Sequence, residues 1–155
     1  MKYLNQNKPT NIVIILAGTN DCIRNVNSKT IAETVIGIHE EAKRRMKAAQ
    51  ISPAHTIAVT IPAFEGASDS RIEINHLIRQ YAVQHSRETW VYEMENFSVP
   101  VEKYRDMWSP DNLHLTVKGY DKMGFELYEV IKRHFGRGDA SYNKSNSLNI
   151  RRMYN

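Results

Sequence analysis

The chain has 155 residues and a formal net charge of +4, with 41% apolar and 25% charged residues. This length and composition are typical of one compact globular domain. No apolar run approaches the roughly 20 residues of a membrane-spanning helix, so the sequence predicts no span. Residues 137–155 carry +3 of the net charge. The rest is nearly neutral and lacks the basic clusters that nucleic-acid binding requires, so no nucleic-acid partner is expected.

A single cysteine excludes internal disulfide bonds and permits a reducing compartment. Residues 1–10 lack the apolar core of a signal peptide. The cytoplasm is therefore the default expectation, but the compartment stays unknown because a targeting signal could have stood ahead of Met1.

The first expected element is a strand over residues 12–17. Six apolar residues, mostly β-branched, run from Ile12 to Ala17 and stop at Gly18. Such a run is typical of a parallel strand that is buried on both faces. A polar tip, Gly18-Thr19-Asn20-Asp21, follows at the carboxyl end of the strand, where open α/β sheets bind their ligands.

Further strands are predicted over residues 55–61 and 89–94, and the latter is expected near the sheet edge. Helices are predicted over residues 28–50, from residue 68 or 69 onward, over residues 99–107 and after residue 116. This order predicts a parallel α/β sheet with right-handed crossovers. The polar, aperiodic residues 137–155 are predicted to form a flexible tail.

Helical periodicity assigns side chains to buried and exposed faces. The first long helix is predicted to start at an N-cap, Ser28, with Ile31, Val35 and Ile38 inward and Lys43 on the polar face. The last helix is predicted to start at Thr116 and to bury one face. That face holds Val117, Tyr120, Met123, Leu127 and Phe135, while four histidines are expected on solvated helix faces: His39, His76, His85 and His134.

A second motif, Ser109-Pro-Asp-Asn-Leu-His-Leu-Thr116, precedes the last helix. Asp111 and His114 lie three residues apart in an expected loop, where a carboxylate can hold an imidazole in one tautomer. Taken singly, these residues also suit simple structural roles: Asn20 as a turn residue, Asp111 as a turn cap and His114 as a packed side chain.

Together, the G-T-N-D and D-x-x-H motifs resemble the third and fifth sequence blocks of the SGNH hydrolases, the GDSL-type esterases and lipases. The resemblance implies a flavodoxin-like three-layer α/β/α fold with strand order 2-1-3-4-5, in a partial domain over residues 1–136. It also implies catalytic roles for His114 as base and Asp111 as its partner, an oxyanion or substrate-binding role for Asn20 and Gly18, and neither cofactor nor metal. The implied substrate is a small ester, such as an acylated sugar, a lipid or a simple ester.

The resemblance also exposes a gap. The family's nucleophile is a serine in a Gly-Asp-Ser block that would precede Asn11, but only ten residues do, and none is serine. The expectation is therefore that this chain lacks the N-terminal strands and the nucleophile of a longer serine hydrolase. As given, it should be inactive, with the edge of its first strand open for pairing with another chain.

Three alternatives stay open. Cys22 could replace the serine in a Cys-His-Asp arrangement, although a small buried cysteine is the commoner case. The chain could be a catalytically inactive remnant that binds a ligand or pairs its open edge with a partner. A flavodoxin-like nucleotide binder with Gly18–Asp21 at its switch point is the third.

Overall fold

The computed structural model describes residues 11–63, 69–94 and 102–135. Their strands form one parallel sheet in the order β1-β2-β3. The register pairs Ile12 with His55 and Thr56 with Thr89. The strands are β1 (Ile12–Ile15), β2 (His55–Val59) and β3 (Thr89–Tyr92).

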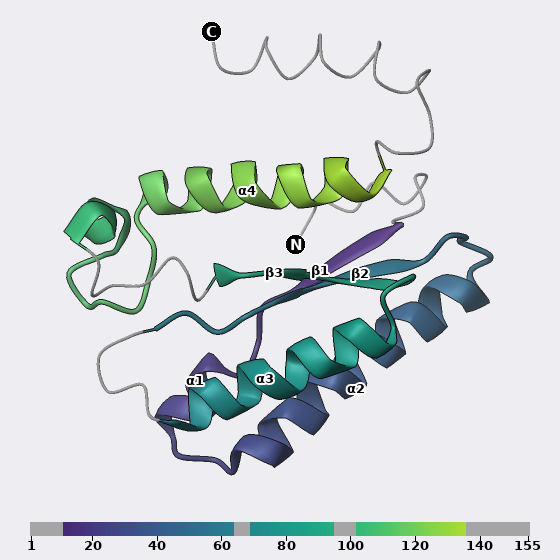
Figure 1. The fold of residues 1–155 in the computed structure, drawn as a ribbon, viewed down its shortest axis with the longest axis horizontal. Helices are drawn as coiled ribbons and strands as arrows, with labels where there is room; N and C mark the ends of the chain where they lie inside the picture. The colour runs from purple at the N-terminus through teal and green to yellow at the C-terminus, as the bar shows by residue number, and fades with distance from the viewer. Residues whose placement is uncertain (1–10, 64–68, 95–101, 136–155) are drawn as a thin grey trace, which may run out of the picture.

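Helices cover both faces of the sheet, so the fold has three layers (Figure 1). Two long helices lie side by side on one face and a third lies on the other. Sequential strand order with two crossovers of the same hand places the first two helices on one face. The predicted parallel α/β architecture is therefore confirmed. The helices are α1 (Thr19–Ile23), α2 (Ser28–Ala48), α3 (Asp69–Gln84), the 3-10 helix η2 (Glu102–Met107) and α4 (Val117–Phe135).

The face under α2 and α3 is sealed by apolar side chains. Ile31 and Val35 of α2 pack with Ile74 and Ile78 of α3 against Ile15 of β1, and all five are buried. The inward side of α3 carries Ile74, Ile78 and Tyr81, and all three are buried. We refer to this side of the sheet as the α2–α3 face.

Three side-chain predictions for α2 are wrong. His39 is fully buried, although it was expected in solvent, and Lys43 is buried, although it was expected on the polar face. The Lys43 ammonium group reaches Glu40 at 3.0 Å and Glu88 at 3.6 Å, and these ion pairs make its burial tolerable. Ile38, which was expected inside, is 43% exposed.

The opposite face, which we call the α4 face, is covered only in part. Leu127 of α4 packs with Ile57 and Val59 of β2 and Trp90 of β3, all of them buried. On β1, Ile14 is 44% exposed. The prediction that the first strand is buried on both faces is therefore wrong, because the described core under α4 is built mainly from β2 and β3 and reaches β1 at the partly buried Ile12.

The N-cap of α2 and the buried face of α4 also differ from the predictions. The α2 N-cap is Asn27 rather than Ser28, and its side chain accepts hydrogen bonds from the backbone N–H groups of Lys29 and Thr30. Thr116 does precede α4 as predicted, and its hydroxyl accepts from the Gly119 N–H at 3.3 Å. Along α4, however, Val117, Tyr120 and Phe135 are exposed rather than buried.

The remaining histidines lie near helix ends or in solvent. His76 is exposed as predicted, and His85 lies one residue past α3, half-buried. His134 is exposed and stacks on Trp90 with ring centroids 4.2 Å apart. The predicted tail over residues 137–155 and the ten N-terminal residues lie outside the described part of the chain. None of the helices described has the length and apolarity to cross a membrane.

Candidate functional site

The carboxyl end of β1 turns sharply at Gly18, which adopts a φ of +94°. A Cβ atom at this position would lie 2.8 Å from Cγ2 of Ile31 and 3.3 Å from Cδ1 of Ile61. Glycine is required here both by the left-handed backbone and by the close approach of α2. The Gly18 carbonyl then accepts from the Cys22 N–H at 2.9 Å. This bond starts α1, so Thr19 and Asn20 lie in its first turn.

The loop that carries Asp111 and His114 is closed by contacts between its two ends. Trp108 and Leu115 form an antiparallel bridge, and both are buried in the α4-face core. Inside this bridge, the Ser109 N–H donates to the His114 carbonyl at 2.7 Å. The loop is therefore anchored at both ends by apolar burial, while its tip is presented to solvent.

Asp111 fixes the His114 ring with both of its carboxylate oxygens. Oδ1 accepts from the backbone N–H groups of Leu113 at 2.9 Å and His114 at 3.0 Å. Oδ2 lies 2.7 Å from Nδ1 of His114. Because an ionised carboxylate can only accept, Nδ1 carries the proton in this contact. That tautomer leaves Nε2 as the free acceptor nitrogen of the ring.

The electrostatics of the loop agree with this geometry. The hydrogen bond from the His114 side chain, followed by those from the two backbone N–H groups, lowers the pKa of Asp111 to about 2. Asp111 is therefore ionised throughout the neutral pH range. The His114 side chain itself is 66% exposed, so its ring is accessible to a ligand.

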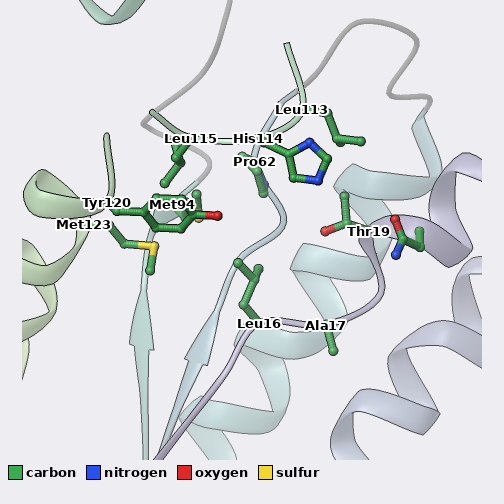
Figure 2. A pocket seen from close by; sticks show the side chains of 11 residues that line it. Leu16, Ala17, Thr19, Pro62, Met94, Leu113, His114, Leu115, Tyr120 and Met123 are labelled. Atoms are coloured by element: carbon green, nitrogen blue, oxygen red, sulfur yellow. The ribbon is translucent and has the colours of Figure 1, made fainter. Parts of the chain in front are cut away.

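A pocket of about 250 Å³ opens beside this ring, between the end of β1, the end of β2, the Asp111 loop and α4 (Figure 2). It brings Asn20 and His114, which lie 94 positions apart in the sequence (114 − 20), into one lining. Gly18 and Asp111 are not among the lining residues. Gly18 permits the turn that leads into α1, and Asp111 holds the His114 ring. The complete lining is Leu16, Ala17, Thr19, Asn20, Pro62, Met94, Leu113, His114, Leu115, Tyr120 and Met123.

Several of these lining residues were missed by the sequence analysis. Tyr120 and Met123 were assigned to the buried face of the last helix, and Leu16 to a buried strand. The available signal was the excess of apolar residues on the last helix, of which Val117, Tyr120, Phe125 and Tyr128 stay exposed. Thr19 was visible within the G-T-N-D motif but was given no role.

Asn75 of α3 holds the backbone just before Pro62, a role that the sequence pattern does not indicate. The buried Asn75 side chain accepts from the Ile61 N–H at 2.7 Å and donates to the Ile61 carbonyl at 2.9 Å. It satisfies the backbone of Ile61, which lies beyond the last pair of the β2–β3 register. This contact positions Ile61 and the following proline beside the pocket.

Cys22 does not lie at the surface of this pocket. Its side chain is buried in the α2–α3 core, with Sγ 3.5 Å from the hydroxyl oxygen of Ser70. A small buried cysteine, the commoner of the two interpretations, is what the structure contains. Within the described ranges, no three side chains of the His, Cys, Asp and Glu types gather as a metal site would require.

Comparisons with known proteins point in one direction. The model of the GDSL-like Lipase/Acylhydrolase family matches residues 2–122. A solved structure, the lipase/acylhydrolase from Enterococcus faecalis, is similar in fold, with a TM-score of 0.57 and 20% identity. The similarity covers 79% of this chain and 61% of that one. A search of the curated proteins finds no match.

Proposed function

Because the chain belongs to the GDSL-like lipase/acylhydrolase family, we propose that it supplies the acid–base half of a serine ester hydrolase. The observation that carries this proposal is the 2.7 Å contact between Asp111 Oδ2 and His114 Nδ1 at the mouth of a pocket that Asn20 also lines. In this scheme a serine hydroxyl attacks the ester carbonyl, and water later hydrolyses the acyl-enzyme.

His114 would act through its free nitrogen. Nε2 takes the proton of the serine hydroxyl as the oxygen attacks the carbonyl carbon, and the imidazolium then returns this proton to the departing alkoxide. Asp111 stabilises the imidazolium through the Nδ1–H bond and stays ionised itself. For deacylation, Nε2 takes a proton from water and finally returns it to the serine.

Asn20 would donate its side-chain amide to the oxyanion of the tetrahedral intermediate. Its position in the first turn of α1, on the pocket lining, supports this role. Loss of one such donor elsewhere lowers kcat by about 100- to 1,000-fold. Gly18 would serve the same site indirectly, since it permits the turn that presents Asn20.

The serine is proposed to come from a polypeptide segment that pairs with the free edge of β1. Among the described residues, β1 pairs with β2 alone. Parallel strand ends share one edge of a sheet, so a strand added beside β1 would end close to Asn20. The 61% coverage of the lipase/acylhydrolase structure is consistent with a longer domain.

Ester hydrolysis by the native protein, purified from its source, tests this proposal. We expect the native protein to hydrolyse p-nitrophenyl butyrate and His114→Ala to reduce the rate by about a thousandfold or more. The matched control is His76→Ala, an exposed histidine away from the pocket, which should leave the rate unchanged. Purified residues 1–155 alone should be inactive, and His114-dependent turnover by that polypeptide would refute the need for an external serine.

A second candidate is a non-catalytic module that pairs its open edge with a partner chain. It is favoured by the exposure of Ile14 and Leu16, each 44%, beside an edge that no other described strand occupies. A soluble dimer or hetero-complex in which residues 11–17 resist hydrogen exchange would support it. A monomer with rapid exchange at these amides would contradict it.

A further inference from the structure

The pocket has two chemically different halves. Thr19 and His114 lie on one side of it, while Met94, Tyr120 and Met123 lie on the other (Figure 2). Leu16 closes the base between them. The reacting bond of an ester would belong to the polar half, and the rest of the substrate must then extend toward α4.

We propose that Met94 and Met123 form an adjustable end wall that receives the unbranched aliphatic chain of the substrate and limits its length. This inference rests on the proposed function, since it places the ester carbonyl beside His114. It selects aliphatic acyl esters over acetylated sugars among the possible substrates.

The polarity of the lining supports an aliphatic chain. None of the described residues that line the pocket is Asp, Glu, Lys or Arg. A phosphate or an ammonium group would therefore lose its hydration without gaining a partner of opposite charge. Beyond the polar half, the hydroxyl of Tyr120 is the one hydrogen-bonding side chain among these lining residues, too few for a sugar ring.

The two methionines suit a chain rather than a rigid ring. Methionine is unbranched and flexible, so its side chain adapts to ligands of different length. Met94 lies two residues past β3, in the buried α4-face core, and Met123 packs against that core from α4. The wall therefore combines a buried methionine from beyond β3 with a partly buried one from α4.

The volume limits the length of the chain. Binding pockets for drug-sized ligands have volumes of roughly 300–1,000 Å³, and this pocket, at about 250 Å³, is smaller. With about 30 Å³ for each heavy atom, the share of one water molecule in the liquid, it holds about eight heavy atoms. An ester group with an acyl chain of about six carbons fills that space.

Methyl-labelled methionine provides a direct test on the 155-residue chain. The chain contains six methionines, of which Met94 and Met123 line the pocket, while Met46 is buried on α2. We would label the methionine methyl carbons with ¹³C and titrate methyl acetate, butyrate, hexanoate and octanoate. The resonances of Met94 and Met123 should shift, with Met46 as the internal control.

Affinity should follow chain length until the pocket is full. Each buried methylene tightens binding about fourfold. The gain should continue to about six carbons and then stop. Unchanged Met94 and Met123 resonances, equal shifts at Met46, or an affinity independent of chain length would each overturn the inference.

A pair of variants on α4 locates the wall. Met123→Phe should shorten the pocket, so that the affinity gain stops near butyrate. Phe125→Met changes an exposed residue of the same helix that does not line the pocket, and should leave the limit unchanged. If Met123→Phe leaves the limit at six carbons while the variant retains the wild-type melting temperature, Met123 is not the wall.

The titration needs no nucleophile, so it separates this inference from the proposed function. Loss of chain-length dependence in a protein whose hydrolysis still requires His114 would overturn the wall alone. Chain-length-dependent binding by a protein that shows no His114-dependent hydrolysis would support the aliphatic site and overturn the proposed function.

Discussion

The two faces of the sheet differ in how completely they are covered. On the α2–α3 face, two helices lie side by side and bury even His39 and Lys43. On the α4 face, one long helix covers β2 and β3 but leaves Ile14 of β1 and Leu16, just past its end, each 44% exposed. The residues proposed for chemistry lie where this incomplete face meets the carboxyl ends of the strands. The comparison indicates that the α2–α3 face provides stability and that the α4 face is open to ligands or partners.

Truncation of one isoleucine on each face should give the largest difference in stability between the two faces. Ile74→Ala, on the sealed side, should lower the free energy of unfolding by about 2–5 kcal/mol, because it leaves a cavity in a close-packed core. Ile14→Ala should cost about 1 kcal/mol or less, since that side chain is already half in water. Urea denaturation measures both. Equal losses would mean that the outer face of β1 is covered in solution.

The buried His39 on the α2–α3 face makes the free energy of unfolding depend on pH. Burial, followed by the nearby Lys43 cation, lowers the pKa of His39 to about 4, while Glu40 acts in the opposite direction. The unfolded chain binds a proton at this residue below about pH 6.5, whereas the folded chain does not. Stability should therefore be complete above pH 6.5 and fall by up to about 3 kcal/mol as the pH drops toward 4.

The difference between wild type and His39→Leu isolates this term, because other groups titrate in both proteins. His39→Leu should flatten the slope between pH 4 and 6.5, whereas His76→Leu, at an exposed site, should not. Parallel pH profiles for wild type and His39→Leu would show that the ring is hydrated in solution.

Two glycines of α4 show which part of this helix is tightly packed on the open face. A methyl group at residue 119 would lie 2.2 Å from the Met107 carbonyl oxygen, whereas one at residue 124 meets nothing within 4 Å. Gly119→Ala should therefore destabilise the protein by about 1–3 kcal/mol and displace the Asp111 loop. Gly124→Ala should stabilise it by up to about 1 kcal/mol. Thermal unfolding and amide spectra of residues 111–115 report both effects, and an undisturbed loop in Gly119→Ala would refute this anchor.

The smallest expected change in stability comes from Asp111→Asn, because this side chain is exposed. The amide can still accept the two backbone hydrogen bonds, but its NH₂ group then faces Nδ1 of His114. The ring should switch to the Nε2–H tautomer, in which the nitrogen needed as a base is protonated. Nitrogen-15 spectra of the imidazole distinguish the tautomers directly. An unchanged tautomer would mean that Asp111 does not orient the ring.

Much of the fold could be predicted because its signals are local. The run from Ile12, the stripe of Ile74, Ile78 and Tyr81, and the three-residue spacing of Asp111 and His114 each depend on neighbouring residues. The burial of His39 was also within reach, since Ile31, Val35 and His39 follow one another at four-residue steps. The prediction instead placed Ile38 on the inward face, and this side chain is exposed.

Other features depend on partners far along the chain. Lys43 is buried because Glu88, from the loop before β3, pairs with it. Asn75 faces inward because Ile61 offers both an N–H and a carbonyl just past the end of β2. The pocket likewise combines β1, α1, the Asp111 loop and α4, so Met94 and Tyr120 could not be assigned to it before the topology was known.

The central claim is that His114 and Asp111 activate a serine that lies outside these 155 residues. The most direct test treats the native protein from its source with a fluorophosphonate, which reacts with activated serines, and maps the adduct by mass spectrometry. The account predicts one adduct, on a serine of a segment paired with β1, and its loss in His114→Ala. An adduct on a serine within residues 1–155, or labelling that persists without His114, would contradict it.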